Sequence, residues 1–359
     1  MELRMVVNRK RKDAMKHNHT INLKQTRKAM LRSRRARRVG LLTLLALSLC
    51  APALAQRRAA EPRAQQQKVR QLPVPAQGNP YTTFYYKSGG LNIEAYFYKP
   101  EGNGPFPLVI YNHGSRSGQE HVEIPFRFIA AILVPQGYAV LVPERRGYGK
   151  SDGPTYDEEV QGDSGDRMMS RFREEASDVL AGLDYLKKGG ASASSGRFTP
   201  TPTTSPVDFR RVALMGWSHG GVVSLLAASE RHEFVALVDQ AGGALTWNRS
   251  QTLQNELPAA ARKIKVPALC MDAENDATTN AAKTVGQAIK SSGEWEKTII
   301  YPPFTPTSNP DNIAPGHLIF AQGVSIWQDD LLAFLKPRLE ANARFERALP
   351  AVPLKRAQP

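Results

Sequence analysis

Residues 211–221 of the chain read RVALMGWSHGG, and this stretch decides the fold. An apolar run leads into Gly216, and an apolar run of helical character follows Gly220. Small residues around Ser218 allow a sharp turn between a strand and a helix, which exposes the serine hydroxyl. The new helix also offers free N–H groups and the positive end of its dipole to an anion. Ser218 is therefore predicted to be a nucleophile.

Further strand and helix patterns lie on both sides of this segment. Residues 91–98 alternate between apolar and polar side chains, which is typical of a strand near a sheet edge. Continuous apolar runs predict strands at 107–111, 138–142, 211–217, 234–239, 266–271 and 297–301. Helical spacing predicts helices over 126–133, 171–188 and 324–335. The alternation predicts the α/β class, with a mostly parallel, doubly wound sheet covered by helices on both faces.

The beginning of the chain has the composition of an export signal. Five arginines within residues 32–38 precede an apolar run at 39–49, and Ala53-Leu54-Ala55 offers a cleavage site before Gln56. We expect residues 1–55 to be a signal peptide, with Met30 as an alternative start and either general or twin-arginine export. An uncleaved leader that anchors the protein is the alternative, although the run is shorter than the ~20 residues of a spanning helix. N-terminal sequencing of the exported protein tests the cleavage.

The remaining boundaries follow from composition. Residues 56–80 are rich in Gln, Arg, Ala and Pro and are expected to be a flexible linker. The α/β domain is expected at 81–340, with a loop insertion at 189–206 that is dense in Gly, Ser, Thr and Pro. Residues 341–359 are expected to form a loose tail. Cys270 lies in an apolar run and is predicted to be a buried core residue rather than a nucleophile.

The net charge of +15 gives little information about partners. Residues 1–55 contain 14 Lys and Arg against two acidic residues, which leaves 34 basic and 31 acidic residues in the rest of the chain. The folded part therefore lacks the basic excess of a nucleic-acid-binding protein. We expect a small-molecule substrate, no nucleic-acid partner and no stable membrane insertion after signal cleavage. The sequence carries no signal for an oligomeric state.

Two downstream loops carry the residues that a nucleophilic serine needs. A serine hydroxyl becomes reactive when a histidine takes its proton and a carboxylate orients that histidine. Asp276 follows the strand at 266–271 and His317 follows the strand at 297–301, so both are expected at the carboxyl ends of strands, where doubly wound sheets bind ligands. Asp276 has an alternative role as a helix cap. Its rivals as the triad acid are Asp239, Asp272 and Glu274.

The strand at 107–111 runs into residues 112–115, which read NHGS. The N–H of Ser115, with that of Gly114 as the alternative, and the N–H of His219 are predicted to bind an oxyanion. The rings of His113 and His219 are expected to be structural or to line a pocket. Three aromatic residues are candidates for a substrate pocket, although core packing explains each nearly as well: Trp217, Tyr148 and Trp247.

Five motifs in this order resemble the α/β hydrolases, within them the dienelactone hydrolase-like and prolyl-oligopeptidase-like serine esterase branch. They are NHG at 112–114, ERRGYGKS at 144–151, GWSHGG at 216–221, END at 274–276 and GH at 316–317, and the resemblance covers residues 82–338. It implies an α/β-hydrolase fold and a hydrolase without metal or cofactor. Such an enzyme acts through an acyl-enzyme on an ester, thioester, lactone or peptide bond. The short connection at 241–266 predicts a minimal cap and an open site.

The chain departs from its two relatives in this branch. Dienelactone hydrolases are similar in layout but use a cysteine where Ser218 stands, so their substrate is not carried over. Prolyl-oligopeptidase-like peptidases usually have a propeller before the hydrolase domain, whereas a short linker precedes Tyr81 here. The expected function is an exported serine carboxylesterase. The alternatives are a serine peptidase or aminopeptidase of the same fold and a non-catalytic binding protein on the same scaffold.

Overall fold

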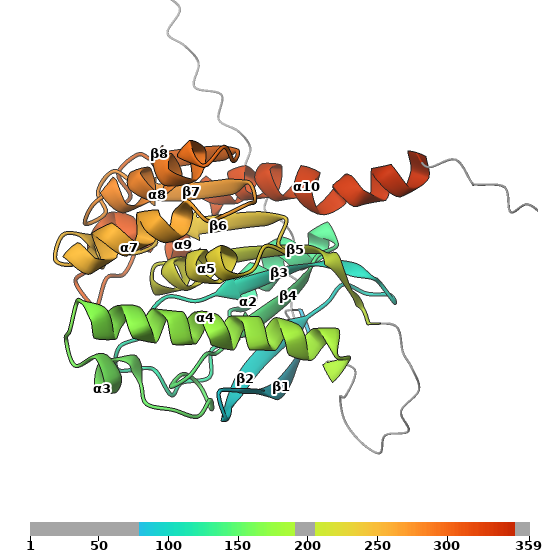
Figure 1. Ribbon diagram of the computed structural model, residues 1–359, viewed down its shortest axis with the longest axis horizontal. Helices are drawn as coiled ribbons and strands as arrows, with labels where there is room; N and C mark the ends of the chain where they lie inside the picture. Colours follow the sequence, from blue (N-terminus) through green and yellow to red (C-terminus); the bar gives the residue numbers. More distant parts are fainter. Residues whose placement is uncertain (1–78, 191–204, 349–359) are drawn as a thin grey trace, which may run out of the picture. The chain divides into compact units, whose positions relative to one another are not determined.

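The computed structural model describes residues 79–190 and 205–348, with side chains as far as residue 340. This part of the chain forms a sheet of eight strands between two layers of helices (Figure 1). The predicted leader, nearly all of the linker, and most of the predicted insertion lie outside the described residues. The strands are β1 (Tyr81–Ser88), β2 (Leu91–Tyr98), β3 (Phe106–Asn112), β4 (Ala139–Pro143), β5 (Val207–Trp217), β6 (Ala236–Gln240), β7 (Ala268–Ala273) and β8 (Glu296–Tyr301).

The order of strands in the sheet is β1-β2-β4-β3-β5-β6-β7-β8. β1 pairs antiparallel with β2, and β2 antiparallel with β4, whereas every pairing from β4 to β8 is parallel. The chain leaves β3 for one edge of the sheet and returns through β5 toward the other edge. Parallel doubly wound sheets bind their ligands at such a switch point, outside the carboxyl ends of the strands. The predicted mostly parallel sheet is confirmed.

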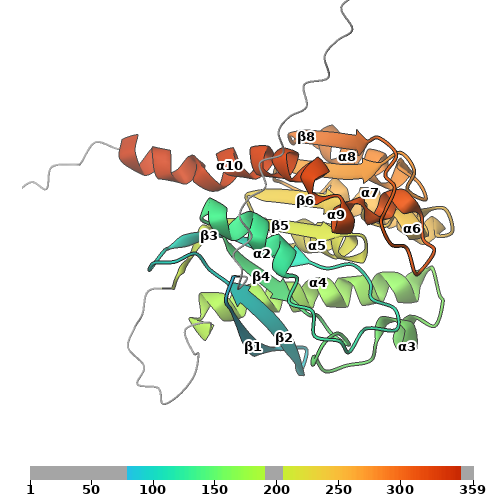
Figure 2. The same ribbon diagram turned by 180° about the vertical axis from the view of Figure 1, so that it is seen from behind.

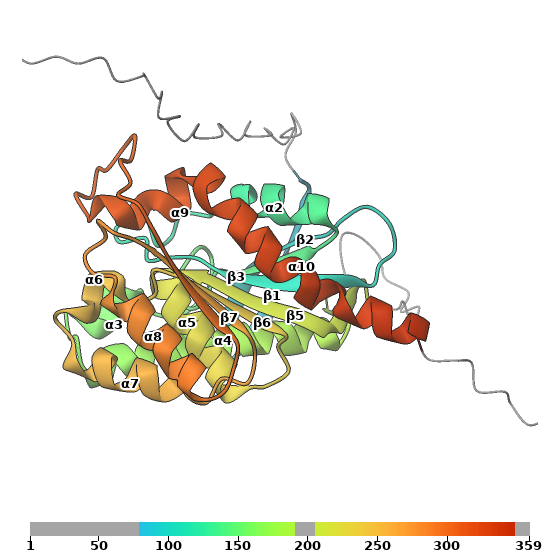
Figure 3. The same cartoon turned by 90° about the horizontal axis from the view of Figure 1, so that it is seen from above.

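Helices cover both faces of the sheet, which is clearest in the edge view (Figure 3). α2, α9 and α10 cover one face, and the view from behind shows these three helices in front of the strands (Figure 2). α3, α4, α5, α7 and α8 cover the other face. The bounds are α2 (Arg127–Leu133), α3 (Tyr156–Val160), α4 (Asp166–Lys187), α5 (His219–Glu230), α6 (Ala244–Trp247), α7 (Gln251–Ala261), α8 (Asn280–Ser291), α9 (Ile319–Gln322) and α10 (Val324–Ala348), with 3₁₀ turns η1 (Val134–Gln136) and η3 (Pro315–Leu318).

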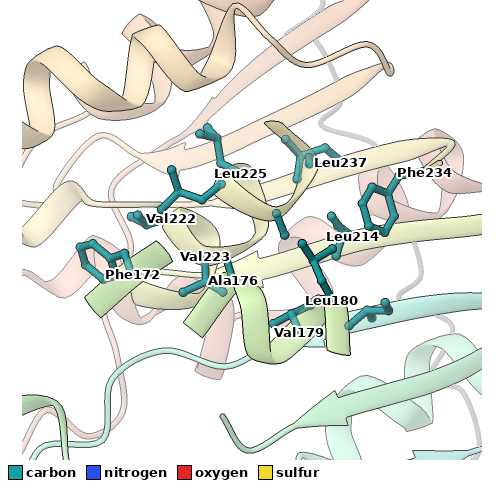
Figure 4. Close-up of a cluster of buried hydrophobic side chains, with 14 of the residues drawn as sticks. Phe172, Ala176, Val179, Leu180, Leu214, Val222, Val223, Leu225, Phe234 and Leu237 are labelled. Carbon is teal, nitrogen blue, oxygen red and sulfur yellow. The ribbon is translucent and has the colours of Figure 1, made fainter. Parts of the chain in front are cut away.

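The packing of α4 and α5 against the sheet places the predicted nucleophile. α5 is buried on all sides from His219 to Ala228, because it lies between the sheet and the helices α4 and α7. Val179 and Leu180 of α4 pack with Leu214 of β5 in one hydrophobic cluster (Figure 4). Full burial of each such side chain contributes about 1.5–3 kcal/mol. The start of α5 is therefore held rigidly above the sheet.

The structure differs from the sequence expectations at three places. β1 was not predicted as a strand, although it forms a hairpin with β2 through Gly89 and Gly90, whose positive φ angles of 53° and 89° suit a tight turn. β5 begins at Val207, four residues before the expected strand. The expected loose tail from residue 341 is wrong as far as Ala348, because α10 continues to that residue. Among the described helices, none is both long enough and apolar enough to cross a membrane.

Candidate active site

Ser218 lies on a strained hinge between β5 and α5. Its backbone angles are φ 56° and ψ −117°, in a region that L-residues rarely adopt. Close packing explains the glycines around it, since a Cβ atom on Gly216 would lie 2.0 Å from the carbonyl oxygen of Gly220. A Cβ on Gly220 would lie 2.0 Å from the carbonyl oxygen of Asn112. The hinge therefore requires the small residues that the sequence places there.

The structure brings Ser218, His317 and Asp276 together in one hydrogen-bonded chain. His317 lies in η3, and its Nε2 is 2.7 Å from Ser218 Oγ. Its Nδ1 is 2.7 Å from Asp276 Oδ2, on the loop after β7. The His317 side chain is only 2% exposed and that of Asp276 is fully buried. This is the arrangement in which a histidine can accept a serine proton while a carboxylate fixes its tautomer.

The structure decides between Asp276 and the other acids that the sequence offered for contact with His317. α8 begins after Thr279 without a side-chain cap, so Asp276 is not the N-cap of that helix. Asp239 Oδ1 accepts a hydrogen bond from Gly242 N at 2.9 Å, and Asp272 Oδ1 accepts one from Ala273 N at 2.8 Å. Glu274 is exposed. Asp276 is thus the acid whose contact with His317 is observed.

Asp272 lies behind Asp276 as a second buried carboxyl group. Burial, together with the negative charge of Asp276, raises the pKa of Asp272 to about 9. Asp239, on the neighbouring strand β6, is also buried, and burial raises its pKa to about 7. Two carboxylates that lie together in a dry site do not both ionise readily. Burial and the neighbouring negative charge therefore favour the protonated form of Asp272.

The predicted oxyanion donors belong to two segments that adjoin Ser218. A Cβ atom on Gly114 would lie 3.5 Å from Ser218 Cβ and 3.1 Å from the Trp217 ring, so the loop that contains Gly114 and Ser115 passes close to the nucleophile. His219 is the first residue of α5, and its N–H therefore lacks a partner four residues earlier in the helix. Each donor that meets a developing oxyanion contributes about 3 kcal/mol.

The three aromatic pocket candidates are placed differently. Trp217 is partly buried, and its Nε1 donates a hydrogen bond to the carbonyl oxygen of His317 at 3.2 Å. Tyr148 is 1% exposed and packs against the guanidinium groups of Arg116 and Arg145. Trp247 is 6% exposed and belongs to the hydrophobic cluster on the α4 side of the sheet. Trp217 is the only one of the three with appreciable surface to offer to a substrate.

A buried group of charged residues beside Ser218 was not predicted. Glu175 of α4 accepts hydrogen bonds from Arg145 Nε and Arg171 Nε, both at 2.8 Å, and its Oε2 lies 2.6 Å from His219 Nε2. We call Glu175, Arg145, Arg171 and His219 the Glu175 cluster. Although burial alone raises the pKa of Glu175, attraction from His219 and Arg145 holds it well below its usual range. Burial lowers the pKa of His219, although the neighbouring Glu175 carboxylate opposes that shift.

The sequence contains a partial indication that Glu175 is buried. Position 175 lies three residues after Phe172 and four before Val179, on the apolar face of the predicted helix. An acid on such a face requires partners. Arg171, four residues earlier on the same helix, is a partner that local spacing could have suggested. The other two partners come from the loop after β4 and from the start of α5, which local sequence patterns do not connect. His113 was expected to be structural or to line a pocket, and its ring stacks on Phe126 with ring centroids 5.0 Å apart. Cys270 is buried, as predicted.

Comparison with known proteins identifies the family of the chain. Residues 62–298 match the family described as X-Pro dipeptidyl-peptidase (S15 family). The chain belongs to the S15 family. Membership of this serine-hydrolase family and the observed sheet confirm the predicted α/β-hydrolase fold. The matched range includes Ser218 and Asp276 and ends before His317, whose place is known from the structure.

Individual relatives are similar over parts of their length. Dipeptidyl-peptidase 5 of Porphyromonas gingivalis is 27% identical over 141 residues, which are 39% of this chain and 17% of the relative. Acylaminoacyl peptidase of Pyrococcus horikoshii has a TM-score of 0.53 and 17% identity, over 73% of this chain and 42% of that protein. An esterase of Pyrococcus furiosus has a TM-score of 0.50 and 18% identity, over 73% of this chain and 93% of that protein. The chain thus covers less than half of the two peptidases.

Proposed function

We propose that this protein is a serine carboxylesterase that works through an acyl-enzyme. The observation that carries the proposal is the chain of 2.7 Å contacts from Ser218 through His317 to Asp276. In this mechanism, Ser218 Oγ attacks the ester carbonyl carbon while His317 Nε2 accepts the hydroxyl proton. Asp276 stabilises the resulting imidazolium and holds its tautomer.

The remaining steps use the proposed oxyanion donors and His317. The N–H groups of Ser115 and His219 hold the negative oxygen of the tetrahedral intermediate. The intermediate collapses when His317 gives its proton to the leaving alkoxide, and Ser218 remains acylated. A water molecule then attacks the acyl group with His317 again as the base, which releases the acid and restores Ser218.

Charge around the site supports an uncharged ester rather than a free amino terminus as the group beside the scissile bond. A dipeptide with a free ammonium group calls for a carboxylate that faces it. Three carboxylates around the proposed machinery already have partners: Asp276 faces His317, Glu175 faces Arg145 and Arg171, and Glu144 pairs with Arg116. The ester proposal rests on these pairings.

A peptidase of the same mechanism is the second candidate. The family match carries the description X-Pro dipeptidyl-peptidase, and the curated relative is a dipeptidyl-peptidase, so peptide bonds form a natural alternative substrate. The same residues serve both reactions, because both proceed through a tetrahedral intermediate and an acyl-enzyme. The two candidates differ in the leaving group, an alkoxide in one and an amine in the other.

The decisive experiment compares Ser218→Ala with Ser229→Ala, a serine near the other end of the same helix. We expect a fluorophosphonate probe to label the wild type and Ser229→Ala but not Ser218→Ala. Hydrolysis of p-nitrophenyl esters should fall about 10⁵-fold or more in Ser218→Ala. The same proteins are assayed on aminoacyl and dipeptidyl amides. Amide hydrolysis far above ester hydrolysis would favour the peptidase, and a folded wild type without labelling would reject both.

A further inference from the structure

The carboxylate of Glu175 is linked through side chains to both backbone segments that carry the proposed oxyanion donors. On one side, its Oε2 is 2.6 Å from Nε2 of His219, the residue whose N–H is the first proposed donor. The ring of His219 is enclosed by Tyr156 and Phe172, with ring centroids 4.9 and 4.7 Å away, so it cannot swing freely. The position of the α5 N-terminus is therefore tied to Glu175.

On the other side, Arg145 links the same carboxylate to the second donor segment. Arg145 Nε donates to Glu175 Oε2 at 2.8 Å, and Arg145 Nη2 donates to the carbonyl oxygen of His113 at 2.9 Å. That carbonyl belongs to the peptide directly before Gly114, and Ser115 follows. Arg145 itself has a φ of 52°, a left-handed conformation in which its side chain is fully buried. Such strain persists where surrounding contacts maintain it.

Arg171 keeps Glu175 in one orientation. Its Nε donates to Glu175 Oε1 at 2.8 Å, so both carboxylate oxygens are occupied, and its Nη2 donates to the carbonyl oxygen of Arg146 at 2.6 Å. The side chains of Glu175, Arg145 and Arg171 have no exposed surface. Hydrogen bonds between buried charged groups are short and directional. The two donor segments are thus joined through a single rigid carboxylate.

From this geometry, and resting on the proposed function, we infer that Glu175 is a positioning residue for the oxyanion site. It sets the separation of the Ser115 and His219 N–H groups without touching the substrate itself. Donors stabilise an oxyanion at about 2.7–3.1 Å. A displacement of about 1 Å costs on the order of 100-fold in rate. Loss of Glu175 should therefore affect the transition state and leave ground-state binding of an ester nearly unchanged.

The test uses Glu175→Gln, with Glu174→Gln as the matched control on the adjacent, partly exposed position of α4. We expect kcat for p-nitrophenyl esters to fall about 100-fold in Glu175→Gln. KM should stay within about twofold, and Glu174→Gln should resemble the wild type. Inhibition by a trifluoromethyl ketone, which forms a tetrahedral adduct with an oxyanion, should weaken in proportion to the loss in kcat/KM.

A second readout separates positioning from general loss of structure. A thionoester presents sulfur where the oxyanion would form, and sulfur is a larger and weaker acceptor than oxygen. The wild type should prefer the oxygen ester strongly, and Glu175→Gln should lose much of that preference. His219→Ala provides a second variant, because it retains the backbone N–H and both arginine contacts of Glu175. It should lower the oxygen-to-sulfur preference in the same direction.

The outcomes distinguish this inference from the proposed function. Fluorophosphonate labelling at Ser218 in both the wild type and Glu175→Gln, together with a lower kcat and a reduced oxygen preference, supports the inference. An unchanged kcat and an unchanged preference in folded Glu175→Gln and His219→Ala would overturn it while leaving Ser218 as the nucleophile. Hydrolysis retained by Ser218→Ala would overturn both.

Discussion

The two flanks of Ser218 are built in different ways. On one flank, His317 and Asp276 come from the segments after β8 and β7 and form a short chain of hydrogen bonds with Ser218. On the other, Glu175 of α4 forms buried ion pairs with Arg145, in the loop after β4, and with Arg171, and a hydrogen bond with His219 at the start of α5. In the proposed mechanism, the residues of the first flank transfer protons, and those of the second hold the backbone segments that carry the oxyanion donors. Substitutions should accordingly lower the rate on the first flank and both rate and stability on the second.

The largest effect is expected for Asp276→Asn. An amide can no longer hold the His317 tautomer or stabilise its charged form, and in serine proteases the equivalent change lowers kcat about 10⁴-fold. We expect a loss of similar size in ester hydrolysis, with a free energy of unfolding close to that of the wild type. Steady-state kinetics and urea unfolding measure the two quantities. The control is Glu274→Gln, an exposed neighbour.

A loss below tenfold in Asp276→Asn would show that another acid serves His317. Asp272 would then be the first to test, since it is buried directly behind Asp276. That result would contradict the contrast between the two flanks, because His317 would then depend on a pair of carboxyl groups rather than on a single acid.

The second prediction concerns stability on the Glu175 flank. Arg145→Met leaves Glu175 buried with one of its two arginine partners and frees the carbonyl oxygen of His113. Removing one member of a buried ion pair costs about 3–5 kcal/mol, and we expect a loss of that size in the free energy of unfolding. The control, Arg173→Met, breaks the exposed pair with Glu256 on α7 and should cost less than about 1 kcal/mol.

Equal losses in Arg145→Met and Arg173→Met would contradict the proposed contribution of the buried Glu175 cluster to stability. The double variant Arg145→Met, Glu175→Met sharpens the result, because it removes both charges. If the stability cost arises from an unpaired buried charge, the double variant should be more stable than Arg145→Met alone. Its oxyanion preference should nevertheless remain impaired, because the contact of Arg145 with the His113 carbonyl oxygen and that of Glu175 with His219 are both missing from it.

The same contrast explains how much the sequence could predict. The strands that carry Ser218 and Asp276 are continuous apolar runs, and each functional residue follows its strand directly. Local pattern and chain order therefore located the three residues that the structure brings together. The central strands were predicted for the same reason, because burial on both faces leaves an unbroken apolar signal, whereas α4 and the first half of α10 were predicted from the helical spacing of their apolar residues.

Features that depend on distant partners were missed. Glu175 and Arg145 are 30 residues apart, and Glu175 and His219 are 44 apart, so no local period connects them. The burial of Tyr148 follows from its packing on Arg116 and Arg145, which the sequence alone does not reveal. The last residues of α10, 341–348, lie beyond the apolar positions Val324, Trp327, Leu331 and Leu335 whose spacing predicts the helix, so the sequence predicts a tail there instead.

The smallest expected effect, and the one most specific to the proton-transfer flank, concerns Asp272. Its pKa of about 9 lies far above the value of about 3.9 for an exposed aspartate. Between these values the folded protein holds a proton that the unfolded chain has released, so the stability contributed by protonated Asp272 decreases as pH rises and is lost through pH 9. The titratable groups that face Asp272 are Asp276 and, on β6, Asp239.

Asp272→Asn stays neutral at every pH and should remove this dependence. Relative to the variant, the wild type should lose about 1 kcal/mol of unfolding free energy for each pH unit between pH 5 and 8. Urea unfolding at pH 5, 6, 7 and 8 measures the slope, and Glu274→Gln should follow the wild type. Parallel stability curves for Asp272→Asn and the wild type would mean that Asp272 is ionised beside Asp276. In that case His317 faces two negative charges, and the proton-transfer flank is itself a buried charge cluster like its counterpart around Glu175.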